Sequence, residues 1–170
     1  MVADYILEVA HATDLESLWD RHVSKMAEFG IERVFYGCTR FRTTKSMGDP
    51  KDFLVLTNHD RRYVDLFFSQ KHYIHAPMLN WSLENYGPTS WQRMHDLYAR
   101  GKLTDKQRMV YEFNLENGIS AGYSISFVPN SQRQGAAMGL VAPRHMEQTE
   151  MDEVWAEHGT EIEAMCQMLH

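Results

Sequence analysis

Two short apolar segments near the carboxyl end constrain the fold most, because together they have the pattern of an antiparallel hairpin. Tyr123, Ile125 and Phe127 alternate with smaller residues, a period of two that predicts a half-buried strand over 119–128. The next residues (PNSQRQ) have turn composition, and 135–142 follows as a second strand of small and apolar residues. A sheet built on this hairpin must bury a face, so other elements have to cover it.

Amphipathic helices that can cover such a sheet are predicted before and after the hairpin. Thr13 with Glu16, and Thr104 with Gln107, have the spacing of a capping box, which marks the start of a helix. Apolar residues then recur at three- and four-residue steps, the pattern of one buried helical face. The predicted helices cover 13–30, 104–118 and 147–169, with weaker helical character over 91–100.

Two more strands are predicted in the first third of the chain. The segment 31–41 is rich in β-branched and aromatic residues, and 53–57 (FLVLT) has the same character. Between them, 43–52 (TTKSMGDPKD) is a polar loop with turn chemistry. The element order predicts a single α+β domain over residues 1–170, in which an antiparallel sheet is sandwiched between helices in α-β-α layers.

The segment 63–91 concentrates aromatic side chains between these two strand pairs. Tyr63, Phe67 and Tyr73 can share a flank of one amphipathic helix. That helix must end near Pro77, because the residue before a proline is pushed out of the α region. The segment can line a pocket for a flat or apolar ligand, and it can equally fill a core. The residues themselves leave both interpretations open.

The composition excludes several classes of function. A net charge of −6 does not provide the basic face that binding to nucleic acid requires. No apolar run reaches the roughly 18 residues of a membrane span, and the first residues lack a signal-peptide pattern. Cys38 and Cys166 form no CxxC pair and are expected to be reduced thiols. We therefore expect a cytoplasmic protein that does not contact a membrane.

The side chains that carry catalysis or hold metals in other proteins do not form a known pattern here. His72 and His75 lie three residues apart, but no carboxylate or cysteine at a fixed spacing completes a zinc site. Ser124 is a possible nucleophile without a surrounding signature. Gly118 and Gly122 lead into a strand, whereas a phosphate-binding loop leads into a helix. We expect no enzyme activity, no cofactor and no metal.

The order of elements and several spaced residues resemble the autoinducer-binding domain of LuxR-type quorum-sensing transcriptional regulators. That family has a Trp, a Tyr one helical turn later, an Asp-Pro pair and a distal Trp. Those positions hold Tyr63, Phe67, Ala76-Pro77 and Trp91 here, and 118–122 (GISAG) matches the family's Gly-Ile-x-x-Gly strand motif. The resemblance covers about residues 5 to 168. It implies the family fold, with a ligand between the sheet and the aromatic helix.

The family's ligand is an N-acyl homoserine lactone, and its contacts imply roles for residues of this chain. The first Trp donates to the lactone carbonyl, the Asp accepts from the amide N–H, and the distal aromatic packs on the lactone ring. The corresponding residues are Tyr63, Ala76 and Trp91.

Two further family contacts bind the acyl-amide carbonyl of the ligand. They come from a Tyr four residues before the first Trp and from a Ser or Thr on the sheet. The corresponding residues are His59 and either Ser124 or Gly139. Phe67 is expected to line the same pocket.

Ala76 is the departure from the family pattern with the largest consequence. A buried amide N–H that loses its acceptor costs about 1–3 kcal/mol. His75 or His72 can replace the missing carboxylate as an acceptor when its ring is neutral. We therefore expect a small hydrophobic signal molecule of non-standard chemistry, for instance an aryl or other non-acyl-lactone compound, or no ligand.

The resemblance also bears on partners. Full-length members of the family carry a helix-turn-helix domain that this chain does not contain, so DNA contact is expected only through that domain. Ligand binding is expected to favour a homodimer. Trp155, Ile162 and Met165 are candidates for its surface, with packing inside the monomer as the alternative. The rival function is a ligand-independent module that dimerises with and modulates a full-length regulator, which the small residues Ala76 and Gly139 favour.

Overall fold

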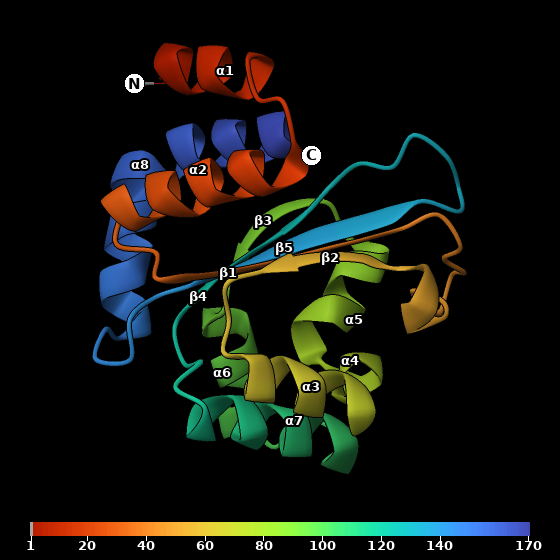
Figure 1. Cartoon of the computed structure of the whole chain (residues 1–170). Helices are drawn as coiled ribbons and strands as arrows, with labels where there is room; N and C mark the ends of the chain where they lie inside the picture. Colours follow the sequence, from red (N-terminus) through yellow and green to blue (C-terminus); the bar gives the residue numbers. More distant parts are fainter. Residues whose placement is uncertain (1) are drawn as a thin grey trace.

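The computed structural model describes residues 2–170, which form three layers (Figure 1). The middle layer is an antiparallel sheet with the strand order β2-β1-β5-β4-β3. The strands are β1 (Arg33–Thr39), β2 (Leu54–Thr57), β3 (Gly87–Ser90), β4 (Gly122–Ser126) and β5 (Gly135–Val141). The predicted α+β architecture, an antiparallel sheet between helices, is confirmed.

Helices cover both faces of the sheet, and Figure 1 shows which helices lie on each side. One face carries the two ends of the described chain: α1 (Val2–Ala10), α2 (Leu15–Glu28) and α8 (Gln148–Leu169). The other face carries the middle of the chain: α3 (Arg61–Ser69), α4 (His72–His75), α5 (Pro77–Glu84), α6 (Gln92–Ala99) and α7 (Asp105–Glu116). A short 3-10 helix, η1 (Pro50–Asp52), precedes β2.

The predicted hairpin is β4 and β5, which pair antiparallel. Tyr123, Ile125 and Phe127 do share one side, toward the core with α1, α2 and α8. The prediction that this strand is half-buried is wrong, because Ser124 and Ser126 on its other side are buried as well. Helices on both faces exclude water from the whole central strand.

The starts of the predicted helices are partly confirmed. The Thr104 and Gln107 capping box is present at the start of α7. The capping box predicted at Thr13 is absent, because Asp14 is the cap of α2 and its carboxylate accepts from the Ser17 backbone N–H over 2.7 Å. A carboxylate also interacts favourably with the positive end of a helix dipole.

The single aromatic helix predicted before Pro77 is wrong, because the backbone breaks at Lys71. Lys71 has φ 57°, in the left-handed region, so α3 ends at Ser69 and the short α4 begins at His72. Pro77 then opens α5 as its first residue, where its missing N–H leaves no helical hydrogen bond unmade. Two helices, α3 and α4, therefore replace the one predicted before Pro77.

The long C-terminal helix packs inside the monomer. Ile162 and Met165 are fully buried against the sheet core, so the proposed dimer surface on these two residues is wrong. Trp155 stacks on Tyr123 of β4, with ring centroids 4.0 Å apart. Within residues 2–170, no helix is long and apolar enough to cross a membrane.

Candidate functional site

The sheet separates two apolar cores, and the second contains a cavity. Val34 and Leu140 face the core with α1, α2 and α8, whereas Phe35 and Val141 face the helices α3 to α7. On this second side the cavity has a volume of about 120 Å³, counted as space for the centres of water molecules. That space exceeds what one buried water needs by several-fold.

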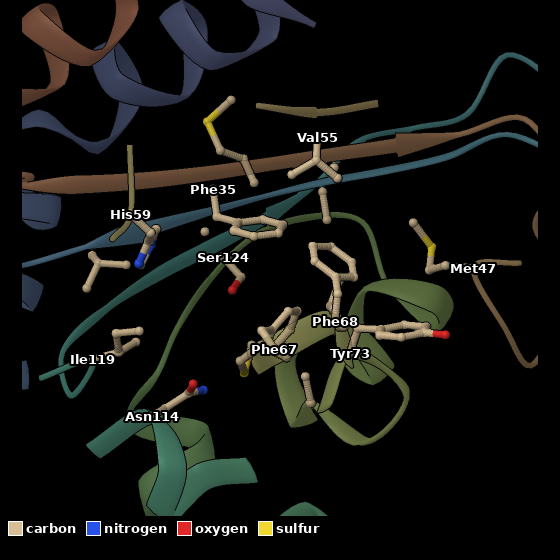
Figure 2. A pocket seen from close by; sticks show the side chains of 18 of the residues that line it. Phe35, Met47, Val55, His59, Phe67, Phe68, Tyr73, Asn114, Ile119 and Ser124 are labelled. Carbon is tan, nitrogen blue, oxygen red and sulfur yellow. The ribbon is translucent and has the colours of Figure 1, made fainter. Parts of the chain in front are cut away.

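Aromatic and aliphatic side chains make up most of the cavity wall (Figure 2). The wall has residues from β1, β2, β4 and β5 on one side and from α3, α4, α5 and α7 on the other. No Asp, Glu, Lys or Arg lines it. Its lining residues are Phe35, Gly37, Cys38, Met47, Phe53, Val55, His59, Tyr63, Phe67, Phe68, Tyr73, Ala76, Met78, Leu79, Trp91, Asn114, Ile119, Ser124, Ala137, Met138, Gly139 and Val141.

A ladder of three rings at the start of α3 forms one wall of the cavity. Tyr63 and Phe67 lie one turn apart on α3, with their ring centroids 5.8 Å apart. His59 precedes the helix, and its ring stacks on that of Tyr63 with the centroids 5.0 Å apart. The Asp60 carboxylate fixes the start of this helix by accepting the Arg62 and Tyr63 backbone N–H groups. The cap thus fixes the residue at which α3 begins, and this determines which of its side chains face the sheet.

Trp91 forms another part of the cavity wall, next to the sheet. Its indole N–H donates to the Ser124 hydroxyl oxygen over 2.9 Å in a buried hydrogen bond. Small residues make room for the ring: a Cβ atom on Gly139 would stand 3.9 Å from it. A Cβ atom on Gly122 would stand 3.0 Å from the ring and would also collide with the Leu140 carbonyl oxygen. The bond uses the Ser124 oxygen as acceptor and leaves its O–H proton free to donate.

The polar groups gather at one end of the cavity. The Tyr63 hydroxyl donates to Asn114 Oδ1 on α7 over 3.0 Å. Burial raises the pKa of Tyr63 above its usual range, so the hydroxyl keeps its proton. Within residues 2–170 the Asn114 side-chain nitrogen donates to no other group. Figure 2 shows Asn114, Ile119 and His59 at the same end.

His59 contributes a nitrogen without a partner. Its Nδ1 atom is buried and forms no hydrogen bond within the described residues. Burial, and secondarily the charge of Arg33, lower the pKa of His59 to about 4. The ring is therefore neutral at neutral pH, with one nitrogen as donor and the other as acceptor. A ligand atom or a water molecule can satisfy Nδ1.

The structure brings together seven of the eight residues predicted to bind a ligand: Tyr63, Phe67, Trp91, Ser124, His59, Ala76 and Gly139 all line the cavity. Whether they bind a ligand stays a prediction. His75 does not line it, although Ala76 beside it does. His75 is the last residue of α4, and the turn into α5 brings Ala76 to the cavity wall and leaves His75 outside it.

Sequence reasoning missed Asn114, and no signal marked it. It lies on an amphipathic helix between Phe113 and Leu115, and an Asn is ordinarily solvent-exposed. It also missed Phe35, although the alternation of β1 places Phe35 opposite the buried Val34 and Tyr36. That alternation was the available signal.

The histidines considered as metal ligands do not form a site. The His72 ring nitrogen Nε2 lies 2.9 Å from Gln70 Oε1, and its ring packs on Phe113 at 4.4 Å. In the part of the chain that the structure describes, no group of three His, Cys, Asp or Glu side chains is placed to hold a metal ion.

Comparisons with known proteins agree with this geometry. The sequence model of the autoinducer binding domain family matches residues 14–170. A search of curated protein sequences finds no match.

Three solved structures resemble 99% of the chain. The N-acylhomoserine lactone dependent LuxR family transcription factor CepR2 from Burkholderia cenocepacia has 13% identity and a TM-score of 0.73, with 91% of that chain covered. SdiA from Escherichia coli has 15% identity and a TM-score of 0.70, and SdiA in complex with octanoyl-rac-glycerol has 14% identity and a TM-score of 0.71. The chain covers 66% and 64% of the two SdiA chains, so it spans about two thirds of their length. At these identities the likeness is one of fold.

Proposed function

Since this chain belongs to the autoinducer-binding domain family, the signal-sensing part of LuxR-type regulators, we propose that it binds a small, largely apolar signal molecule in the cavity between the sheet and α3 to α7. The observation that carries the proposal is a mostly apolar cavity with a few polar side chains on its wall. Ligand sites in proteins have this composition, because apolar walls supply affinity and few polar groups supply orientation. The family is one of sensors and not of catalysts.

The chemistry of the wall restricts the ligand's head group. Ala76 brings a methyl group to the wall where the family resemblance places a carboxylate, and no other carboxylate lines the cavity. A ligand amide N–H would have no charged acceptor there, at a cost of about 1–3 kcal/mol. We therefore favour a ligand without an amide N–H, such as an ester or a ketone.

The family donor at position 63 is also changed. The Tyr63 hydroxyl proton is engaged by Asn114, so it does not reach a ligand carbonyl directly. The free donors of the cavity are the Asn114 side-chain N–H groups and the Ser124 O–H. Both suit a ligand with acceptor oxygens, and His59 Nδ1 suits one further polar contact. An acyl ester with hydroxyl groups combines these features.

Two of the similar proteins differ in the ligand that their names give. CepR2 is described as dependent on N-acylhomoserine lactone, an amide. One SdiA structure contains octanoyl-rac-glycerol, an ester. The second chemistry fits the present cavity better, because it requires no acceptor at Ala76. This supports an acyl ester or a related oxygen-bearing apolar molecule as the signal.

We further propose that the domain acts as a homodimer and controls transcription through a helix-turn-helix domain outside residues 1–170. Ligand binding to the folded state stabilises that state, so the signal would add to folding and assembly. The SdiA chains, of which this chain covers about two thirds, support the association with further sequence. The dimer surface must involve residues other than the buried Ile162 and Met165.

The rival function, a ligand-independent module that modulates a full-length regulator, receives less support. Small residues at Ala76 and Gly139 would suit a pocket closed by protein side chains, but both line a cavity of about 120 Å³. An interaction module gains nothing from such a cavity, since missing contacts lower stability.

The test compares two probes with the same octanoyl chain, one an ester of glycerol and the other an amide of homoserine lactone. Octanoyl glycerol and N-octanoyl homoserine lactone are titrated into the purified protein, and the melting temperature and the fluorescence of its tryptophans are followed. The proposal predicts that the ester binds more tightly. Preference for the lactone, or binding of neither, contradicts it.

A further inference from the structure

A second cavity adjoins the proposed signal cavity, and three side chains line both. Met47, Tyr73 and Leu79 separate the signal cavity from a space that we call the outer chamber. The outer chamber lies between the loop 45–48 and the helices α4 and α5. Its volume, counted in the same way, is about 200 Å³, larger than the signal cavity. The two spaces are therefore neighbours with a common wall of these three side chains.

The loop that closes the outer chamber is held by several hydrogen bonds. The Thr43 backbone N–H donates to the Ser46 carbonyl oxygen over 2.8 Å, and the Gly48 N–H donates to the Ser46 hydroxyl oxygen over 3.1 Å. Arg42 ties the loop to α5 by donating to the Leu83 carbonyl oxygen over 2.7 Å. These hydrogen bonds hold the loop in place as one wall of the outer chamber.

The partition combines one fixed and one adaptable side chain. The ring of Tyr73 meets Phe53 edge-on, at 6.1 Å and 90°, and packs on Phe68 in a tilted contact at 5.6 Å and 39°. Met47 has three rotatable bonds and adapts its shape to a neighbour. Figure 2 shows Met47 and Tyr73 at the end of the signal cavity opposite His59 and Asn114. A chain that enters at the polar end and extends along the cavity thus reaches this partition.

The outer chamber differs from the signal cavity in charge. Lys45 lines it and is the one Lys, Arg, Asp or Glu that lines either space. The Ser46 oxygen already accepts from Gly48, which leaves its O–H to donate. Asn80 also lines the chamber, and its side-chain nitrogen donates to the Ile74 carbonyl oxygen. Lys45 and Ser46 thus offer one charged and one neutral donor, and such a pair can bind a carboxylate.

We propose that the two spaces hold one elongated ligand whose apolar chain passes between Met47, Tyr73 and Leu79 and ends in a carboxylate beside Lys45. This inference rests on the proposed function, because the ligand's other end occupies the signal cavity. It assigns the outer chamber as a second subsite, one that selects chain length and the terminal group.

The experiment uses two series of probes on the purified chain. One series is the glycerol monoesters of octanoic, decanoic, dodecanoic and tetradecanoic acids. The other series consists of the same esters with a carboxylate at the far end of the acyl chain. Dissociation constants are measured by calorimetry for the natural sequence and three variants. Met47→Trp fills the partition, Lys45→Met removes the charge, and Lys51→Met removes an exposed lysine of η1 that lines neither space.

The natural sequence should gain about fourfold in affinity for each CH₂ group that becomes buried as the chain lengthens. A terminal carboxylate on the longer probes should add about tenfold. Lys45→Met should lose that tenfold and Lys51→Met should keep it. Met47→Trp should lose the gain for probes longer than the octanoyl ester.

The outcomes separate the two proposals. If the octanoyl ester binds but longer or carboxylated probes bind no better, the two-space inference is overturned and the proposed function stands. A carboxylate advantage that survives Lys45→Met also overturns the inference. If no probe binds the natural sequence, the proposed function fails and the inference falls with it.

Discussion

The hydroxyl of Tyr63 on α3 donates a hydrogen bond to Oδ1 of Asn114 on α7, 51 positions along the chain and 3.0 Å away. This bond joins two helices across the polar end of the cavity. It consumes the one hydroxyl proton of Tyr63, and it orients the Asn114 amide so that its N–H groups remain available. We therefore predict that Asn114 donates to the ligand's head group and that Tyr63 positions it.

Tyr63→Phe tests this arrangement, because it removes the hydroxyl and keeps the ring stack with His59 and Phe67. The free energy of unfolding should fall by about 1 kcal/mol, the net value of one hydrogen bond. Affinity for octanoyl glycerol should fall as well, since Asn114 loses its orientation. Urea denaturation and calorimetry measure the two effects. Tyr98→Phe is the matched control, because Tyr98 bonds Glu112 at the surface and its loss should leave affinity unchanged.

Trp91 is the second test, because its ring fills the space over Gly122 and Gly139. Trp91→Ala should lower the free energy of unfolding by about 3–5 kcal/mol, as expected for a buried large-to-small change, and should abolish ligand binding. Trp91→Phe keeps an aromatic ring but leaves Ser124 without its donor, so it should bind with reduced affinity. Unchanged binding by Trp91→Ala would locate the ligand elsewhere.

Ala76 determines the third prediction. Ala76→Asp supplies an acceptor for an amide N–H, so the variant should bind N-octanoyl homoserine lactone more tightly relative to octanoyl glycerol. It should also be less stable without ligand, because a carboxylate in an apolar wall loses hydration. Ala76→Leu, of similar size without the oxygens, should lose affinity for both probes. If Ala76→Asp and Ala76→Leu change the affinity for the lactone equally, position 76 does not face the amide of the ligand.

Buried histidines determine how stability depends on pH. His22 is fully buried, and burial lowers its pKa to about 4 from the ordinary 6.5. Its Nδ1 lies 2.7 Å from the Tyr5 hydroxyl, and burial raises the pKa of Tyr5 above its usual range. Tyr5 therefore keeps its proton and donates to the neutral ring. Between pH 6.5 and pH 4, His22 is protonated in the unfolded chain and neutral in the folded chain. The free energy of unfolding therefore falls as the pH drops from about 6.5 to about 4.

The size of this loss is about 3 kcal/mol for His22, and His59 adds to it in the same pH range. Chemical denaturation at a series of pH values measures it. His22→Gln should flatten the dependence, whereas His145→Gln, at an exposed position between β5 and α8, should leave it unchanged. A dependence of the same steepness in His22→Gln and the natural sequence contradicts the assignment.

Part of this site could be predicted, mainly from the resemblance to the autoinducer-binding family. The residues alone predicted that Tyr63 and Phe67 share a helix face, which a helical repeat specifies. The resemblance assigned Trp91 and Ser124 to the ligand site, and all four side chains line the cavity.

The remaining features depend on contacts that local sequence does not specify. Lys71 adopts a left-handed conformation without being glycine, so no residue type signalled the break between α3 and α4. The edge strand β3 contains Pro88, which argues against a strand except at a sheet edge. Asn114 faces inward only because α7 packs beneath α3 and α4. Tertiary packing determined each of these.

Mass spectrometry of the purified protein under native conditions, followed by denaturing extraction, tests the central claim most directly. The account predicts a population heavier than the chain by one small molecule of a few hundred daltons, which denaturation releases and which contains no amide. A protein that is stable and dimeric, yet shows only the mass of the bare chain after growth in conditions that supply the signal, would contradict the account. That result would favour the ligand-independent module instead.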